Sequence, residues 1–486
     1  MRFTLLLAVL WIFISAIAIS TAQDKFKKGK ATDYGDLRYK TDNDFAQMLD
    51  QPWMKLKMLP GLKADTTPKP MHTPFAKVSD QDQQQYDEAV RESRPVKPTP
   101  PPPPVYQPEP EPVVKPPPVP PKPTTELLNF TFFATPVALR YDPDFKTGSY
   151  KKIDNGAISR FWQTMSQTDY DDFLTQAKHY QRSLKLNDWG YVLFLIDCGY
   201  NIQGRSSTYA NLFAWFMLVK SGYDAKVGYD EGQVYLLLPS NYSWYEMPYF
   251  PIQGKYYFAA SPANTDNVKT VQIYSGSYPG ANQTIDIRLT ESPELQRAVK
   301  AKTLTLKNAG EEAEITITYS QSIIDFYNRY PQSDLEIYLQ AAVSPDVANS
   351  LAGELQPYIE GKSEVEAVNF LLNFVQTSFS YQTDGEQFGQ EKFFFAEEAF
   401  HYQSCDCEDR SVLFAYLVKT LTDLDVVALD YPGHIAAAVR FSDDIPGDDV
   451  IWKGQRYVIC DPTYIGALVG MRMPEYADTR PTVINI

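Results

Sequence analysis

The chain has 486 residues, enough for two or three domains, and 44% of them are hydrophobic. Its formal net charge of −15 argues against a nucleic-acid-binding protein, because such proteins present a basic face. We therefore expect no nucleic-acid partner.

The first 22 residues are organised like a secretory signal peptide. Arg2 supplies a positive start, residues 5–19 are apolar, and Ser20-Thr21-Ala22 offers a small-residue cleavage site. A membrane anchor is the alternative, but the apolar run is short for a span. No other run approaches ~20 apolar residues. We therefore expect an exported bacterial protein, periplasmic or extracellular, whose mature chain has no transmembrane span.

Two segments of unusual composition precede the predicted folded part. Residues 23–94 are polar with few apolar periods, which predicts a largely disordered region. Within it, Phe45–Met58 fits one short amphipathic helix, and Phe45, Leu49 and Trp53 offer the alternative of a docking segment for a partner. Residues 95–123 are about half proline and predict an extended spacer rather than a PxxP ligand.

The folded part is expected to begin near Leu127 and to divide into three pieces. A mixed pattern of helices and strands fills residues 124–265. Alternating stretches in residues 266–321 indicate a connecting β segment, with a turn at Asn308-Ala309-Gly310. A last domain over residues 322–486 begins with helical patterns, the clearest of them an amphipathic helix at 365–379.

Three residues of the last domain form a candidate catalytic set. Cys407 lies where a polar loop gives way to a helical pattern, and a helix N-terminus favours a thiolate. His434 follows the turn signal Tyr431-Pro432-Gly433 and begins an apolar strand, whereas Asp461 ends a second strand before Pro462. If the two strands pair antiparallel, Asp461 can orient the imidazole of His434, which serves Cys407 as the base.

This pattern resembles the signature of the transglutaminase-like superfamily, whose fold is papain-like. The signature places a Cys in C-x-D-x-[AS]-x-L at a helix start, a His at the start of a strand, and an Asp in D-P-T. The matching positions here are Cys407, Asp409, Ser411, Leu413, His434 and Asp461-Pro462-Thr463. The resemblance covers residues 322–486. It departs from the family where an aromatic often follows the His (H-x-W), because Ile435-Ala436 stand there instead.

The resemblance implies an α+β fold in which N-terminal helices pack on an antiparallel sheet. It also implies a cysteine enzyme that acts on amide or peptide bonds through an acyl-thioester. Water as the acceptor gives a protease or amidase, and an amine gives a transglutaminase. The expected partner is a peptide or protein substrate, including components of the cell envelope, and no cofactor is expected.

Two further residues acquire expected roles from the resemblance. Tyr381 is expected near the cleft, where it either helps to bind an oxyanion or only packs. Asp409 is expected to fix the helix start and its loop rather than to carry a proton. Glu408 and Asp409 would both oppose thiolate formation if they pointed at the sulfur.

An earlier stretch repeats the pattern without its chemistry. Residues 204–239 align with the block that begins at Cys407 without a gap, and residues 254–257 align with 454–457 after one residue of slip. The counterparts of Cys407, His434 and Asp461 are then Ser206, Gln233 and Ser261. Duplication with loss of chemistry explains this better than chance similarity. Residues 124–265 are thus predicted to be a degenerate copy, and the alternative function of the chain is a non-catalytic envelope scaffold or binding protein.

Four cysteines in an exported chain suggest disulfides, but their positions favour other roles. Cys405 and Cys407 are too close in sequence for an easy bond to each other. Cys198 follows an apolar run and is expected to be buried. Cys460 should face the core if Asp461 faces the site, because neighbours in a strand point to opposite faces. This alternation removes Cys460 from a conceivable zinc site with Cys405, Cys407 and the histidine, so no metal is expected.

Overall fold

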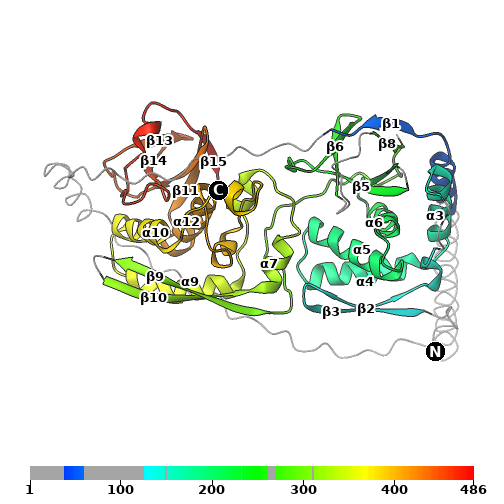
Figure 1. The fold of residues 1–486 in the computed structure, drawn as a ribbon, viewed down its shortest axis with the longest axis horizontal. Helices are drawn as coiled ribbons and strands as arrows, with labels where there is room; N and C mark the ends of the chain where they lie inside the picture. Colours follow the sequence, from blue (N-terminus) through cyan, green and yellow to red (C-terminus); the bar gives the residue numbers. More distant parts are fainter. Residues whose placement is uncertain are drawn as a thin grey trace, which may run out of the picture.

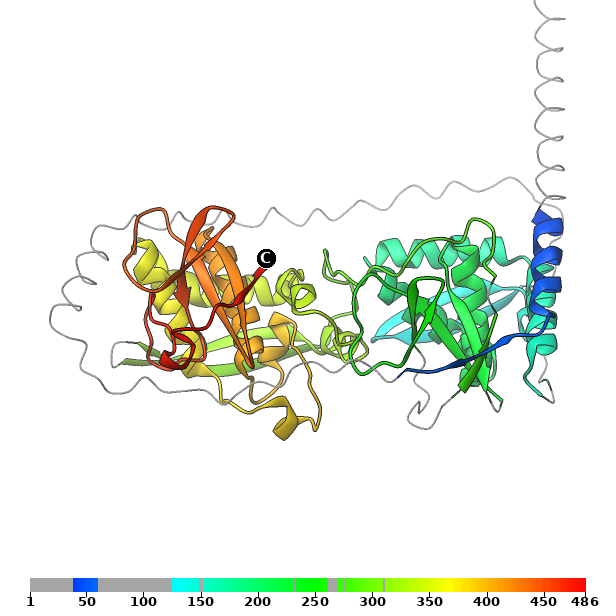
Figure 2. The same cartoon turned by 90° about the horizontal axis from the view of Figure 1, so that it is seen from above.

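The structure, a computed structural model, describes most of the chain beyond the proline-rich region. The described residues are 38–59, 125–147, 150, 152–230, 232–260, 270–274, 276–308 and 311–486. The predicted signal peptide, the proline-rich spacer and Ser261 lie outside them. The described chain forms two halves that lie end to end along the long axis (Figures 1 and 2). Both halves combine helices with antiparallel sheets, so the fold class is α+β as predicted.

The first half begins with helical residues 38–49 and ends with a strand that returns to the main sheet. Its further elements are β1 (Met54–Lys57), β2 (Glu126–Phe132), β3 (Thr135–Tyr141), η1 (Pro143–Phe145), α3 (Asn155–Ser166), α4 (Tyr170–Ser183), α5 (Asp188–Ile202), α6 (Ser207–Lys220), β4 (Lys226–Asp230), β5 (Gln233–Pro239), β6 (Tyr249–Ile252), β7 (Lys255–Ala259) and β8 (Thr270–Ile273).

The second half begins with a long hairpin and ends with a strand at the edge of its sheet. Its elements are β9 (Val299–Asn308), β10 (Glu311–Ser320), α7 (Gln321–Tyr327), α8 (Leu335–Leu339), α9 (Pro345–Ile359), α10 (Glu364–Ser378), α11 (Asp384–Gln387), η2 (Ala396–Phe400), α12 (Cys407–Thr422), β11 (Asp425–Tyr431), β12 (His434–Arg440), β13 (Asp449–Trp452), β14 (Gln455–Cys460), η3 (Pro474–Tyr476) and β15 (Thr482–Asn485).

The two larger sheets have the same order of strands. The first sheet runs β8-β4-β5-β7-β6, with β1 added beside β8, and the second runs β15-β11-β12-β14-β13. All neighbouring strands in both sheets are antiparallel. Helices α4, α5 and α6 of the first half lie between its sheet and the hairpin β2–β3, and α10 and α12 of the second half lie between its sheet and the hairpin β9–β10 (Figure 1). The halves therefore share a layered arrangement as well as a strand order.

The second sheet is buried on both faces, which explains its almost continuous apolar sequence. Val426 and Ala428 belong to the core beneath the helices, whereas Val427 and Leu429 pack on the opposite face. This alternation follows from the two-residue period of a strand. The C-terminal segment that includes Tyr476 covers the second face, so residues after β14 help to close the site region.

The hairpin β11–β12 fixes the position of His434. Tyr431 pairs with His434, which leaves Pro432 and Gly433 as the two turn residues. Gly433 has φ of 74°, a conformation that glycine adopts without the steric cost of a Cβ. Proline followed by glycine suits such a turn because proline presets the φ of the first turn residue. The sequence predicted this turn correctly, and the histidine consequently begins the strand.

Capping boxes define the starts of the two helices nearest the site. Ser363 and Glu366 exchange hydrogen bonds at the start of α10. Asp406 and Asp409 do the same at the start of α12, so that Cys407 is its first residue. These caps satisfy backbone N–H groups that have no partner within the helix.

The prediction of disorder is wrong for residues 38–59. Helical residues 38–49 pack on the first half, and β1 pairs with β8 as an extra strand of its sheet. Phe45 lies 4.6 Å from Trp162 between ring centroids, and Leu49 and Trp53 are also buried. The helix predicted at Phe45–Met58 is wrong in its bounds, because the helical residues are 38–49 and residues 54–57 form β1. The three apolar residues suggested as a docking segment are buried within the chain itself, and the partner of Phe45 lies more than 100 positions later.

The boundaries predicted for the connecting segment also change. The predicted strands exist, but β8 completes the first sheet, and β9–β10 packs on α9 and α10 of the second half. Residues 266–321 therefore do not form a separate β connection, because each strand finds its burial within one of the two halves. The centre of the predicted turn, residues 309–310, lies outside the described residues.

Within the described ranges, no helix combines the length and apolar character that a membrane crossing requires.

The packing of residues 38–59 predicts that Phe45→Ala lowers the stability of the first half. Truncating a buried Phe typically costs about 3–5 kcal/mol, so the melting temperature should fall clearly in calorimetry. Tyr39→Ala on the same helix is the matched control, because Tyr39 is 62% exposed and such changes usually stay within about 0.5 kcal/mol. Equal melting temperatures for the two variants would contradict the packing.

Candidate active site

His434 and Asp461 form a buried hydrogen-bonded pair at the ends of adjacent strands. His434 begins β12, Asp461 directly follows β14, and these strands pair antiparallel. The distance between Nε2 of His434 and Oδ2 of Asp461 is 2.8 Å. The other carboxylate oxygen, Oδ1, accepts the backbone N–H groups of Thr463 and Tyr464 at 2.9 and 3.1 Å. Asp461 is therefore held in place before it orients the imidazole.

The second ring nitrogen of His434 has a different environment. Nδ1 is buried and has no hydrogen-bond partner among the described residues. The rings of Tyr431 and Tyr476 lie nearly parallel to the imidazole, with centroids at 6.2 and 5.1 Å. Because Nε2 is engaged by Asp461, Nδ1 is the nitrogen that can exchange a proton with another group.

Cys407 lies against the strand that begins at His434. Ser411, one helical turn after the cysteine, donates a hydrogen bond to the carbonyl of Ile435 at 3.1 Å. A backbone hydrogen bond from Ile435 also reaches the sulfur of Cys407. The structure thus places Cys407 at the start of α12, which packs against β12, while His434 at the start of β12 contacts Asp461 at the end of β14.

The thiol of Cys407 is shielded from solvent in this arrangement and favours its protonated form. Cys407 is 0% exposed, and its sulfur donates a hydrogen bond to Oε2 of Glu408 at 3.2 Å. Burial raises the pKa of Cys407 well above its usual range, and the carboxylates of Glu408 and Asp406 raise it further. The sequence-based concern about Glu408 is therefore realised, because its carboxylate does point at the sulfur.

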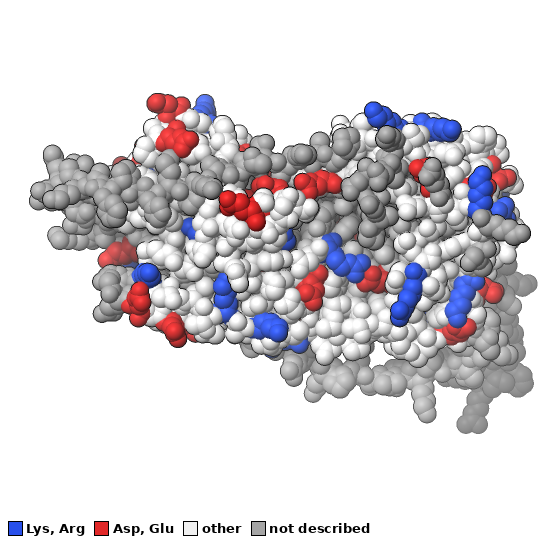
Figure 3. All heavy atoms as spheres, viewed as in Figure 1, with Lys and Arg blue, Asp and Glu red and all other residues white. Residues whose placement is uncertain are grey.

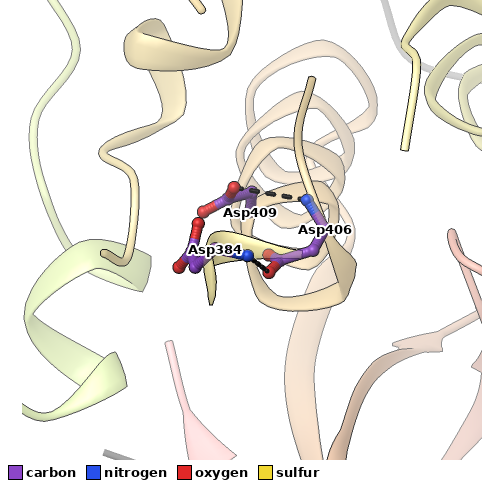
Figure 4. A group of neighbouring side chains, drawn as sticks. All are labelled: Asp384, Asp406 and Asp409. Atoms are coloured by element: carbon purple, nitrogen blue, oxygen red, sulfur yellow. Dashed lines mark hydrogen bonds between the residues drawn. The ribbon is translucent and has the colours of Figure 1, made fainter. Parts of the chain in front are cut away.

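Five acidic residues surround the start of α12, and their number was not expected from the sequence. Asp384, Asp406 and Asp409 bring one oxygen each within 4.8 Å of one another (Figure 4). Asp384, Glu391 and Glu408 form a second group with the same spacing. Burial, followed by the charge of Asp406, raises the pKa of Asp384 to about 8. The same two causes raise the pKa of Glu408 and Asp409 well above their usual range.

This acidic cluster contains the described residues that could hold a metal ion. Oxygen ligands alone suit a hard cation such as Ca²⁺ or Mg²⁺ rather than zinc. The predicted zinc alternative does not fit, because no three-ligand group among the described residues includes a Cys or His. Protons can neutralise the same carboxylates, as the raised pKa values show.

Asp409 and Tyr381 occupy the surroundings of the cysteine. Oδ1 of Asp409 accepts the backbone N–H of Phe394 at 2.9 Å, and Oδ2 accepts that of Asp406 at 3.4 Å. Asp409 therefore ties a distant loop to the helix start. Tyr381 stacks on the guanidinium of Arg410 at 5.4 Å, and its pKa is raised by burial and then by the nearby Cys407.

Comparison of the chain with protein-family models, curated protein sequences and solved structures gave no match.

Gln376 is a positioning residue that sequence reasoning missed. Its side-chain amide on α10 donates to the carbonyls of Asp461, Tyr464 and Ala467 at 3.0, 3.0 and 3.2 Å. Its carbonyl oxygen accepts the N–H of Gly466 at 3.1 Å. The available signal was weak, because the helix predicted at 365–379 carries three amide side chains, Asn369, Asn373 and Gln376. Which segment it holds depends on tertiary structure.

The counterparts in the first half lack this chemistry. Ser206 caps α6, where its hydroxyl accepts the N–H of Tyr209 at 3.5 Å. Gln233 begins β5 as His434 begins β12, but it is exposed, and its side chain accepts from the hydroxyl of Tyr235. Ser206 and Gln233 therefore occupy the same places in the order of helices and strands as Cys407 and His434.

All four cysteines are buried free thiols, so the suggestion of disulfides is not met. Cys198 lies in the core, and Cys460 faces the core beneath the helices as the strand alternation predicted. The hydrophobic core, rather than a cross-link, accounts for both of these side chains.

The raised pKa of Asp384 predicts a pH-dependent effect of Asp384→Asn. Folding favours the protonated carboxyl, so wild-type stability should fall as the pH rises from about 4 towards 8, where each pKa unit represents about 1.4 kcal/mol. Asn mimics the neutral form and removes this loss. The melting temperature of the variant should therefore gain on wild type between pH 5 and pH 8, in buffer with a chelator.

Glu314→Gln provides the matched control, because Glu314 is an exposed carboxylate on β10, remote from the cluster in the fold. The melting temperature of Glu314→Gln should differ from that of wild type by the same amount at every pH in this range. If the difference for Asp384→Asn were also constant, the carboxyl would not be held protonated by the fold.

Proposed function

We propose that this chain is an exported cysteine enzyme of the transglutaminase-like superfamily that acts on amide or peptide bonds through an acyl-thioester. The supporting observation is the state of His434, whose Nε2 is bound to Asp461 while its buried Nδ1 has no partner in the described part of the chain. Cys407 lies at the start of a helix packed against the same strand. This is the arrangement that a nucleophile, base and orienter require.

In the proposed first half-reaction, His434 takes the thiol proton at Nδ1, and the sulfur of Cys407 attacks the carbonyl carbon. The C–N bond then breaks, and the leaving amine takes the proton from the imidazolium. Asp461 keeps the ring in place and stabilises its positive charge. The backbone N–H of Ile435, which already reaches the sulfur, is suited to stabilise charge at the reacting centre.

The second half-reaction releases the acyl group from the sulfur. His434 activates an acceptor, whose oxygen or nitrogen attacks the thioester as the C–S bond breaks, and the thiol is restored. Water gives hydrolysis, as in a protease or amidase, and an amine gives a transferase.

The hydrogen bond from Cys407 to Glu408 describes a resting state in this proposal. For attack, the sulfur must leave Glu408 and turn towards His434, whose Nδ1 is unoccupied by any described residue. Charge is then balanced by the imidazolium, which offsets the unfavourable effect of the carboxylates on the thiolate. Activation by substrate is thus part of the proposed mechanism.

A non-catalytic scaffold is the second candidate, and the closed thiol is the observation that favours it. Cys407, His434 and Asp461 are each at most 2% exposed. A purely structural protein could bury such a trio as part of its core. We favour the enzyme, because a structural role does not explain why a buried imidazole nitrogen is left without a partner.

We further propose that the first half is a non-catalytic copy of the second. The shared order of five strands and the matching hairpins β4–β5 and β11–β12 support duplication. In this view the buried pattern preserves the fold, while a few site residues decide whether chemistry is present.

The proposal predicts that a peptidyl vinyl sulfone labels Cys407 selectively, although all four thiols are buried. Site-resolved mass spectrometry should show modification at Cys407 and none at the other three positions. His434→Gln should slow labelling by about 10²-fold or more, because the general base is lost. Labelling at equal rates on all four cysteines would favour the scaffold.

Cys407→Ala should abolish labelling and turnover of fluorescent protein or peptide substrates. Its melting temperature should stay close to that of wild type, since a small side chain replaces a small side chain. Cys198→Ala is the matched control, because Cys198 is an equally buried thiol in the first half. The Cys198→Ala variant should be labelled at Cys407 as fast as wild type. Retained turnover in Cys407→Ala would remove the cysteine from the mechanism.

A further inference from the structure

A pocket lies where the two halves meet, and His434 belongs to its wall. Its volume is about 280 Å³, and its wall includes His434 and Ile435 from β12, Glu408 from α12 and Tyr245 from the first half. Small-molecule sites usually measure ~300–1,000 Å³. The pocket therefore suits one side chain or a small organic group rather than a large ligand.

The wall of the pocket is strongly acidic. Four acidic residues line it, Asp334, Glu336, Glu408 and Asp430, and none of the described lining residues is Lys or Arg. Because the pKa of Glu408 is raised by burial and then by Asp406, the negative charge comes from the other three. Acidic side chains also gather at the junction of the halves in the space-filling view (Figure 3). The pocket thus presents a local negative potential that repels anions and attracts cations.

Glu408 is the buried member of the pocket wall. Its side chain is 0% exposed, and Oε1 has no hydrogen-bond partner among the described residues, whereas Oε2 accepts from Cys407. Burial, followed by the charge of Asp406, raises the pKa of Glu408 well above its usual range, so this side chain favours its neutral form. In that form Oε1 can still accept a hydrogen bond from a donor group that enters the pocket.

Aromatic side chains complete the wall. Tyr245 and Phe393 meet edge to face with ring centroids 6.5 Å apart, and Tyr431 lies at the end of β11. Aromatic faces attract ammonium and guanidinium groups, particularly where water is excluded. Carboxylates together with aromatic rings are a combination that favours an organic cation over a small hydrated ion.

The first half builds part of this wall. Trp244 and Ser333 form an antiparallel bridge between the halves. Beside it, the hydroxyl of Tyr245 donates to Oδ1 of Asp334 at 2.9 Å, and the N–H of Ser243 donates to Oδ2 at 3.3 Å. These contacts hold Asp334 at the pocket, so a half without catalytic residues still contributes to the site.

We propose that this pocket binds the cationic group of a peptide substrate, the ammonium of a lysine or the guanidinium of an arginine, close to the amide that Cys407 attacks. Calling the bound peptide a substrate rests on the proposed function, whereas binding of the cationic group does not depend on catalysis. It assigns Asp334 and Glu336 to specificity, and it gives the first half the role of completing the substrate pocket.

The test measures binding to the full mature chain carrying Cys407→Ala, so that no turnover interferes. The probes are Nα-acetyl-lysine N-methylamide, the arginine equivalent, and the norleucine and glutamate equivalents as neutral and acidic matches. Titration calorimetry should show the lysine or arginine probe binding at least tenfold more tightly than norleucine, with no binding of glutamate. Affinity should fall as salt is raised, because the attraction is electrostatic. The two cationic arms identify which group fits.

Variants then locate the site. Glu336→Gln and Asp334→Asn should each lower the affinity for the cationic probe about tenfold and leave the affinity for the norleucine probe unchanged. Glu314→Gln on β10 should change neither affinity. Melting temperatures confirm folding, and Glu336, which is only half-buried, keeps the test valid if Asp334→Asn unfolds.

Three outcomes would overturn the inference: equal binding of the lysine and norleucine probes, cation binding that survives both variants, or a pocket that responds only to added Ca²⁺ or Mg²⁺. The same experiments distinguish a failure of this inference from a failure of the proposed function. Cation binding without labelling of Cys407 would leave the pocket and remove the enzyme, and labelling without cation preference would do the reverse.

Discussion

The buried hydrogen bond between His434 and Asp461 is the constraint on which the second half of this protein depends. It joins the start of β12 to the end of β14, and both partners are withdrawn from water. Removing one partner of a buried hydrogen bond leaves the other group unsatisfied, which costs about 1–3 kcal/mol. The backbone amides on Oδ1 of Asp461 and the three carbonyls held by Gln376 extend this requirement to the loop after β14 and to α10.

The start of α12 reconciles two opposing electrostatic demands. Asp406, Glu408 and Asp409 suit the N-terminus of a helix, because their charges complement its dipole and two of them form the capping box. Burial, followed by the charges of Glu408 and Asp406, raises the pKa of Cys407. The start of α12 is stabilised by the same charges, while the thiol of Cys407 stays protonated and shielded from solvent. In the proposed mechanism, reactivity depends on an event that separates the sulfur of Cys407 from Glu408.

The two halves show how one arrangement of strands carries different chemistry. Their sheets have the same strand order, and their central hairpins both have two-residue connections in the corresponding place. Burial demands apolar residues at the same positions in both sheets, whereas the residue that begins β5 or β12 is free to vary. Where Gln233 is exposed in the first half, His434 is buried in the second, because the C-terminal segment with Tyr476 covers the second sheet only.

Local patterns were sufficient for the elements and for the three central side chains. The turn before His434, the helix that begins at Cys407 and the strand that ends before Asp461 are each encoded by neighbouring residues, so the sequence alone placed them correctly. The alternation that sends Cys460 to the core is equally local. What only the tertiary structure decided were contacts between distant segments. These include the burial of Phe45 and Trp53, the hold of Gln376 on the loop after β14, the gathering of Asp384 with the acids of α12, and the approach of Tyr245 to Asp334. The physical reason is that periodicity and turn chemistry act over a few residues, whereas burial and charge clustering depend on which surfaces meet when the whole chain folds.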